Sequence, residues 1–219
     1  MSGMRLTDRE QAPDISMMIK CIPRGPLASN MYLAHLNNDW FVIDPSVDPD
    51  SLDEEIKSLT AVLITHGHYD HIKYIDKWHS KFPDALIFMS NDDASLAADP
   101  RTNCSYMDGA AKTFDFPYED PKDAVRFGNL SIRVIKTPGH TMGSVCYLFS
   151  DEGKDYLFTG DTIFAGSIGR TDMTGGSFEL MQKSIKVIRK LSPETCVLPG
   201  HGPDSTIGLE IRYNPFFAE

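Results

Sequence analysis

The residues best suited to chemistry form one short run, residues 65–71, which reads Thr-His-Gly-His-Tyr-Asp-His. Three histidines and a carboxylate lie within six residues of one another. Neutral imidazole binds zinc, iron and other transition metals, and a carboxylate widens the choice towards iron and manganese. We interpret the run as a metal-binding loop. The alternative is a histidine-rich loop with no ligand role.

The spacing within this run predicts two neighbouring metal positions. His66 and His68 are two residues apart, so in an extended chain their side chains point the same way. Asp70 and His71 follow on the far side of the turn and can serve a second, adjacent position. One strand end is therefore expected to supply ligands to two ions.

The segments on either side predict how the run is held. The apolar stretch 61–64 precedes it, and apolar residues at helical spacing follow it over 72–82. The ligands are therefore expected on a loop that connects a buried strand to a helix.

Three further candidate ligands lie downstream, and each follows a predicted strand and a glycine: His140, Asp161 and His201. Small residues there allow loops from different strands to crowd around one point. Five of the seven histidines thus fall at predicted strand ends. This favours ligands over core histidines, and it favours a ligand over a simple turn role for Asp161. His35 and His79 lack this context, and we expect them to be structural.

Seven ligands are too many for one tetrahedral ion. They divide into two sites about 3.5 Å apart that share one carboxylate. We expect three histidines at one site, an aspartate and two histidines at the other, and Asp161 at both. The expected cofactors are two divalent metal ions, with zinc favoured and iron or manganese as alternatives.

The composition favours one domain without a nucleic-acid-binding face. The chain has 219 residues, of which 41% are hydrophobic, and this is enough for one sizeable core. We predict a flexible N-terminus over 1–14 and a single domain over 15–219. The net charge of −10 and the lack of a Lys/Arg cluster argue against a nucleic-acid partner.

Localisation is predicted from three sequence features. No stretch approaches the roughly 18 apolar residues of a membrane span, and the N-terminus is polar where a signal peptide would be apolar. The four cysteines are widely spaced without a C-x-x-C pair, so we interpret them as small buried residues in a reducing compartment. We expect a cytoplasmic protein with no membrane partner, and the oligomeric state stays open.

Strands and helices are expected to alternate along most of the chain. The predicted strands cover 15–22, 31–36, 40–43, 61–64, 85–88, 130–135, 145–149, 156–158 and 195–198. The predicted helices cover 51–59, 72–82, a segment through 96 capped by Asn91, and a segment capped by Ser177, and a short polar tail ends the chain. Residues 99–126 are least regular. They form either a surface loop that packs its aromatic residues on the core or a substrate-facing flap.

The two halves of the chain show a weak internal echo. In the first half a predicted strand ends at Asp44, a helix follows, and the next strand ends at His66. In the second half a strand ends at Asp161, a helix follows, and the next strand ends at His201. The pattern predicts two sheets, each covered by helices, with the ligands at their shared rim.

Four motifs in this order resemble the metal motifs of metallo-β-lactamase-fold hydrolases, and the resemblance extends from about residue 15 to 215. They read Thr-His-Gly-His-Tyr-Asp-His, Thr-Pro-Gly-His-Thr, Phe-Thr-Gly-Asp-Thr and Pro-Gly-His-Gly. The resemblance implies an α/β fold, an αββα sandwich of two mixed sheets flanked by helices.

The resemblance also implies a role for each candidate residue. The first metal ion would be held by His66, His68 and His140. The second would be held by Asp70, His71 and His201. Asp161 would bridge the two ions, and Asp44 would support the ligand loops instead of binding metal.

Within this family, a bridging Asp161 is similar to the glyoxalase II group (hydroxyacylglutathione hydrolase), whereas β-lactamases of the commonest zinc type have cysteine there. Residues 164–172 and 213–215 resemble short bacterial glyoxalase II-like proteins. Arg170 falls near a basic residue that grips glutathione in that group, and the alternative is that it pairs with Asp172. Only 18 residues, 202–219, follow His201, whereas full-length glyoxalase II has a C-terminal helical region that contacts glutathione. Glutathione specificity is therefore not carried over.

The sequence supports three hypotheses for the function. The first is hydrolysis of a small-molecule thioester or ester, with a glutathione conjugate among the candidates. A metal-bridging hydroxide would be the nucleophile, with Asp70 and Asp161 as the catalytic carboxylates, because metal ions lower the pKa of bound water from 15.7 towards about 7. The second, implied by resemblance to persulfide dioxygenases, is an oxygenase that uses one iron held by two histidines and one aspartate. The third is a lactonase or phosphodiesterase. A non-enzymatic binding module is disfavoured because all seven ligands are present.

Overall fold

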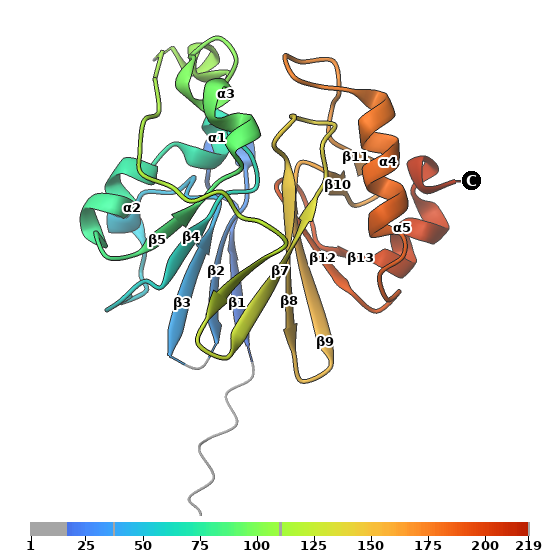
Figure 1. Ribbon diagram of the computed structural model, residues 1–219, viewed down its shortest axis with the longest axis horizontal. Helices are drawn as coiled ribbons and strands as arrows, with labels where there is room; N and C mark the ends of the chain where they lie inside the picture. Colours follow the sequence, from blue (N-terminus) through green and yellow to red (C-terminus); the bar gives the residue numbers. More distant parts are fainter. Residues whose placement is uncertain (1–16, 37, 110, 219) are drawn as a thin grey trace, which may run out of the picture.

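The computed structural model describes residues 17–36, 38–109 and 111–218, and it contains two mixed sheets packed face to face with helices on both outer sides (Figure 1). This arrangement confirms the predicted αββα sandwich of the α/β class. The segment 1–14, predicted to be flexible, lies outside the described residues. Within the described residues, no helix is long and apolar enough to cross a membrane.

The first sheet has five strands in sequence order: β1 (Met18–Ile22), β2 (Met31–Leu36), β3 (Asp39–Ile43), β4 (Ala61–Leu63) and β5 (Leu86–Phe88). Strands β1, β2 and β3 are antiparallel, whereas β3, β4 and β5 are parallel. The carboxyl ends of β3 and β4 therefore meet at one edge, where Asp44 and His66 follow them in the chain.

The second sheet has the order β13-β12-β9-β8-β7-β6. Its strands are β6 (Ala124–Phe127), β7 (Leu130–Lys136), β8 (Val145–Asp151), β9 (Lys154–Gly160), β12 (Cys196–Pro199) and β13 (Ser205–Thr206). The pair β9–β12 is parallel, and the other pairs are antiparallel. A small hairpin, β10 (Ile163–Phe164) with β11 (Ser167–Ile168), follows β9.

The α-helices are α1 (Tyr69–Ile72), α2 (Ile75–Lys81), α3 (Ala94–Ala98), α4 (Phe178–Ile188) and α5 (Ile207–Tyr213). Helices α1, α2 and α3 lie on the outer side of the first sheet, and α4 and α5 lie on the outer side of the second (Figure 1). Ser177 caps α4 as predicted, since its side chain accepts a hydrogen bond from the Leu180 N–H.

Several predicted helix boundaries were wrong. No α-helix forms over 51–59, where a short 3-10 turn covers Pro49–Ser51 and is capped by Asp48. A helix of two turns is costly to nucleate and needs a continuous apolar face, which this segment lacks. The predicted helix 72–82 begins earlier, at Tyr69, and is interrupted between Ile72 and Ile75.

The predictions for one helix cap and for the C-terminal tail also need correction. Ser90, not Asn91, caps the next helical segment, because the Ser90 side chain accepts from the Asp92 N–H. The C-terminal tail, for which only a short polar segment was predicted, contains α5. Its cap is Thr206, which accepts from the Leu209 N–H, and its residue Ile207 is fully buried.

Three apolar layers hold the sandwich together, and strand alternation assigns side chains to them. Along β3, Phe41 and Ile43 face the other sheet, while Val42 faces the helices of the first sheet. The layer between the sheets contains the aromatic residues Phe41, Phe149 and Phe158, whose rings meet edge-on at centroid distances of 5.5 and 5.3 Å. This layer fixes the position of one sheet on the other, and hence of one set of loops on the other.

The four cysteines are free, and the expectation that they are buried was wrong for most of them. Cys146 is fully buried, Cys104 and Cys196 are half-buried, and Cys21 is exposed. Cys21 lies on β1, an edge strand on which Met18 and Lys20 are exposed as well.

Replacing Phe149 should test the role of the layer between the sheets. We expect Phe149→Ala to lower the free energy of unfolding by about 3–5 kcal/mol, because a large buried ring leaves a cavity. Urea unfolding followed by circular dichroism measures this. The matched control is Phe216→Ala, whose side chain is 41% exposed and which should cost less than about 1 kcal/mol. Equal losses for the two variants would contradict the assigned role.

Candidate metal centre

All seven predicted ligands converge at the rim where the loops of the two sheets meet. His66 and His68 follow β4, and Asp70 and His71 lie in α1. The remaining three, His140, Asp161 and His201, follow β7, β9 and β12 of the second sheet. Both sheets therefore contribute ligands, as the internal echo predicted.

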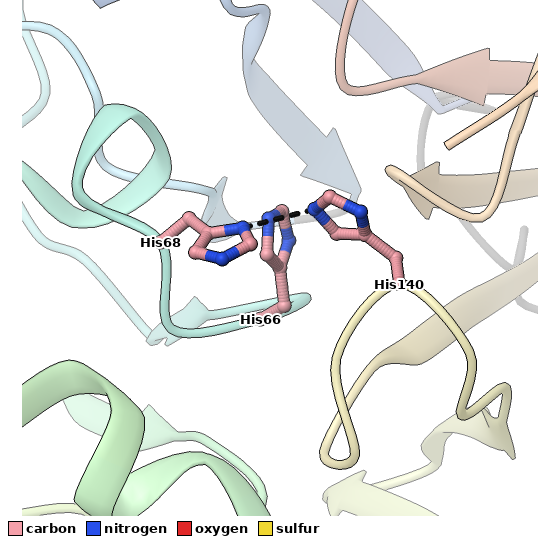
Figure 2. Close-up of side chains that lie close together, drawn as sticks. All are labelled: His66, His68 and His140. Atoms are coloured by element: carbon pink, nitrogen blue, oxygen red, sulfur yellow. Dashed lines mark hydrogen bonds between the residues drawn. The ribbon is translucent and has the colours of Figure 1, made fainter. Parts of the chain in front are cut away.

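One group consists of His66, His68 and His140, whose candidate ligand atoms all lie within 4.8 Å of one another. Figure 2 shows the three imidazole rings turned towards one another, with His68 Nδ1 2.9 Å from His140 Nε2. On its other side, His140 Nδ1 is 2.7 Å from the carbonyl oxygen of Arg170. Because that carbonyl can only accept, His140 Nδ1 is the donor and the lone pair of Nε2 faces the group.

A second group consists of Asp70, His71 and His201, again within 4.8 Å of one another. His201 Nε2 lies 3.2 Å from Asp70 Oδ2 and 3.3 Å from His71 Nε2. Three candidate metal-ligand atoms, two from α1 and one from the loop after β12, thus face a common point.

Asp161 lies between the two groups. Its Oδ2 is 3.6 Å from His140 Nε2 in the first group and 3.6 Å from His201 Nε2 in the second. Its Oδ1 is 3.4 Å from His71 Nε2. This carboxylate is therefore in reach of histidines from both groups, the position a bridging ligand needs.

Unpaired buried atoms indicate that the site fits metal ions. His66 Nε2 and Asp161 Oδ1 are buried and have no hydrogen-bond partner among the described residues. A buried polar atom without a partner costs about 1–3 kcal/mol, so native proteins rarely leave one unexplained. Imidazole nitrogens and carboxylate oxygens are ligands for divalent transition-metal ions. The cluster therefore has the composition of a divalent metal centre.

The electrostatics of the cluster also favour cations. Burial lowers the pKa of His68 to about 3 and that of His66 well below its usual value, so both imidazoles keep free lone pairs at neutral pH. Burial alone would raise the pKa of Asp161, but His71 and His140 outweigh it and hold that pKa well below normal. Burial would likewise lower the pKa of His71, but Asp70 and Asp161 raise it. Bound metal ions would supply the positive charge beside Asp70 and Asp161 that a proton on His71 supplies in their absence.

Asp44 supports the ligand run through three hydrogen bonds. Its carboxylate accepts from the Thr65 N–H and hydroxyl, both at 2.7 Å, and from His71 Nδ1 at 2.9 Å. The last bond turns His71 Nε2 towards the second group. A carboxylate oxygen of Asp44 also lies within 4.8 Å of ring nitrogens of His66 and His71. Both oxygens of Asp44, however, already accept hydrogen bonds. A supporting role fits the geometry better than a ligand role.

Glycines allow the loops to approach as closely as they do. Gly160 has a φ of 47°, and a Cβ there would lie 2.3 Å from Thr65 Oγ1. A Cβ on Gly200 would lie 2.4 Å from Asp161 Oδ1. The predicted crowding of loops around one point therefore depends on these two residues.

Asp93 is a site residue that the sequence analysis missed. It is fully buried, and its Oδ2 accepts from the Gly67 N–H and the Thr141 hydroxyl, both at 2.8 Å. Its Oδ1 accepts from the Gly143 N–H at 2.7 Å. Asp93 thus joins the ligand run of the first sheet to the His140 loop of the second. No local signal marked it, because its partners are distant in sequence.

A cavity of about 410 Å³ opens beside the cluster and is lined by Asp70, His140, Asp161 and Arg170, among others. The Arg170 guanidinium donates to both carboxylate oxygens of Asp172, at 2.7 and 2.9 Å. The alternative of pairing with Asp172 is thus what the structure shows, and a contact between Arg170 and substrate stays a prediction.

Residues 99–126 combine the two alternatives considered for them. Phe114 and Phe116 are buried and pack on the core of the first sheet. Cys104 and Met107 line the cavity beside the cluster. The segment therefore packs on the core at one end and faces the candidate site at the other.

Comparison with known proteins places these features in a family. The model of the metallo-beta-lactamase superfamily matches residues 24–201, a range that contains every candidate ligand. YqgX of Bacillus subtilis, named as a probable metallo-hydrolase, is 33% identical over 204 residues, which cover 89% of this chain and 95% of YqgX.

Solved structures show the same fold. The BLEG-1 B3 metallo-beta-lactamase is 34% identical with a TM-score of 0.83, over 92% of this chain and 100% of that one. TTHA1623, in a di-iron-bound form, is 31% identical with a TM-score of 0.77, over 90% and 99%. ETHE1 from Myxococcus xanthus is 29% identical with a TM-score of 0.68, over 90% and 83%.

Replacing Asp93 should loosen the cluster without removing a candidate ligand. In Asp93→Asn the amide NH₂ must face at least one N–H or O–H donor, so one bond between the ligand loops is lost. We expect metal affinity, measured by competition with a chelator, to fall by about 10–100-fold. The neighbouring exposed residue provides the control Asp92→Asn, which should keep its affinity. Unchanged affinity in Asp93→Asn would contradict the positioning role.

Proposed function

This chain belongs to the metallo-beta-lactamase superfamily, and from that premise we propose that it is a metal-dependent hydrolase that cleaves thioesters. The observation that carries the proposal is the convergence of two ligand groups on one carboxylate, Asp161, beside an open cavity. The name of YqgX, a probable metallo-hydrolase, supports the hydrolase class.

We assign the ligands as two sets that share Asp161. The first set is His66, His68 and His140, and the second is Asp70, His71 and His201. Two divalent ions held there would polarise a carbonyl oxygen and acidify a water molecule. Zinc is the favoured ion, and the di-iron form of TTHA1623 supports iron as the alternative.

The chain's own side chains prepare this chemistry. Asp70 and Asp161 are carboxylates whose pKa values are lowered: burial opposes the shift, and neighbouring histidines outweigh it. Both face the cavity and can accept a hydrogen bond from the attacking water. His71 is held by Asp44 and His140 by the Arg170 carbonyl, so both rings keep their Nε2 atoms turned towards the cluster.

The cavity favours a leaving group that needs no proton. Among the described residues that line it, Cys104 is the one neutral acid outside the cluster, and burial raises its pKa above that of an ordinary thiol. An amine leaving from an amide requires a proton donor, whereas a thiolate with a solution pKa of about 8.5 departs readily without one. This supports a thioester over an amide substrate.

A second candidate is an iron-dependent oxygenase that acts on a persulfide. The similarity to ETHE1 from Myxococcus xanthus gives this alternative some support. One iron held by two histidines and one aspartate could be bound by residues of this same cluster, so the ligand geometry does not separate the two candidates. Metal analysis, with oxygen uptake measured on glutathione persulfide, does separate them. A single iron with rapid oxygen uptake and no thioester turnover would replace the hydrolase proposal.

Hydrolysis of thioesters by the metal-loaded protein tests the proposal directly. Substrates are S-lactoylglutathione and the acetyl thioester of N-acetylcysteamine, with released thiol as the readout and metal content determined on the same sample. We expect turnover of at least one thioester with about two metal ions per chain. No turnover of any thioester by protein that holds two ions would refute the substrate assignment.

Substitution of Asp161 tests the shared ligand. We expect Asp161→Ala to lower kcat/KM by more than about 100-fold and to reduce retention of both ions, because removal of a ligand costs more than removal of a supporting residue. The control is Asp76→Ala, an exposed carboxylate on α2. An Asp161→Ala variant with full activity and two ions would exclude the bridging role.

A further inference from the structure

We infer that the substrate is uncharged and apolar on both sides of the scissile thioester, so that glutathione thioesters are not its preferred class. The inference rests on the proposed thioester hydrolysis. It is drawn from the cavity beside the cluster, whose apolar side chains are Leu27, Met107, Phe164, Ile168 and Met173.

Two of these side chains expose large apolar surfaces at the entrance. Leu27 is 72% exposed and Met107 is 62% exposed. They also share a side cavity of about 110 Å³ with Pro26, next to Asp70 of the cluster. At the inner end, the Phe164 ring packs edge-on against His201, with centroids 6.0 Å apart. Apolar surface thus continues from solvent to the candidate ligands, as in a ligand-binding groove.

The backbone holds Leu27 at this place despite an unfavourable conformation. Leu27 has φ 55° and Ala28 has φ 57°, in the left-handed region that non-glycine residues seldom adopt. Flanking bonds anchor the segment to the ligand loops. The Ser29 hydroxyl donates to the Asp70 carbonyl at 2.6 Å, and the Asn30 N–H donates to the Gly200 carbonyl at 2.7 Å. Strained backbone held in this way clusters at functional sites, and here it presents an apolar side chain.

The charges around the cavity do not favour an anionic substrate. Among the described lining residues outside the histidine cluster, Arg170 is the one cation, and its guanidinium forms a two-bond pair with Asp172. The side cavity carries a further carboxylate, Asp108, which pairs with Lys73 and with the Tyr69 hydroxyl. A peptide thiol such as glutathione would bring two carboxylates to this surface, where each cation among the described lining residues outside the histidine cluster already has a carboxylate partner.

Four thioesters separate the two parts of the inference. Acetyl and hexanoyl groups are each joined to glutathione and to N-acetylcysteamine, a neutral thiol of similar reactivity. For the same acyl group, we expect kcat/KM to be at least about tenfold higher for the N-acetylcysteamine thioester than for the glutathione thioester. From acetyl to hexanoyl we expect a rise of about threefold to fourfold for each methylene that becomes buried.

A variant pair assigns the effect to the cavity. Leu27→Asn removes the apolar surface while retaining a residue that tolerates the left-handed region. We expect it to lose about tenfold in the preference for hexanoyl over acetyl. The control is Leu209→Asn, which alters an exposed leucine on α5 and should keep the preference. Calorimetry with the non-hydrolysable S-hexyl thioethers of the two thiols gives a readout independent of turnover.

The outcomes distinguish this inference from the proposed function. Faster hydrolysis of the glutathione thioesters, or no gain from the longer acyl chain, would overturn the inference and leave hydrolysis standing. Preferred binding of the neutral thioether without turnover of any thioester would refute hydrolysis and support the apolar ligand class. The expected result is preference for the neutral thiol in both assays, with the Leu27→Asn variant losing the acyl-chain effect.

Discussion

The arrangement of the site depends on the contacts of the Asp161 carboxylate, whose side chain is only 12% exposed. This carboxylate is the point where histidines carried by the first sheet meet histidines carried by the second, at 3.4 to 3.6 Å. A carboxylate out of water is costly unless cations compensate it. His71, whose pKa is raised by Asp70 and Asp161 against the opposing effect of burial, supplies part of that compensation as a cation, and bound metal ions would supply more. The Asp161 carboxylate is therefore compensated by groups from both halves of the sandwich.

Two other buried carboxylates, Asp44 and Asp93, hold the ligand loops in place through hydrogen bonds. Asp44 orients His71 within the first half, and Asp93 joins the first half to the His140 loop of the second. Each accepts three hydrogen bonds from loop groups, so neither leaves the loops free to separate. The ligand rim is thus held by polar contacts above an aromatic layer that fixes the distance between the sheets.

The internal echo has a physical counterpart. Each sheet contains a parallel strand pair, β3–β4 and β9–β12, and each pair places an aspartate and a histidine at its carboxyl end. The halves differ in what connects the pair: α4 in the second half, and a 3-10 turn with irregular chain in the first. They also differ in the role of the aspartate. Asp44 is closed off by three donors, whereas Asp161 keeps an oxygen without a hydrogen-bond partner.

The sequence by itself determined the sandwich architecture and the identity of the seven candidate ligands. The sandwich was predicted from short apolar stretches, the internal echo and the resemblance of four motifs to a known family. The candidate ligands were predicted from histidines and aspartates that follow predicted strands. Only the tertiary structure showed the atoms by which each group converges, the position of Asp93, and the apolar entrance formed by Leu27 and Met107. These contacts join residues far apart in the chain, and no local pattern encodes which distant loops will meet. Helix ends were also decided there, because packing against the sheet outweighs short-range capping signals.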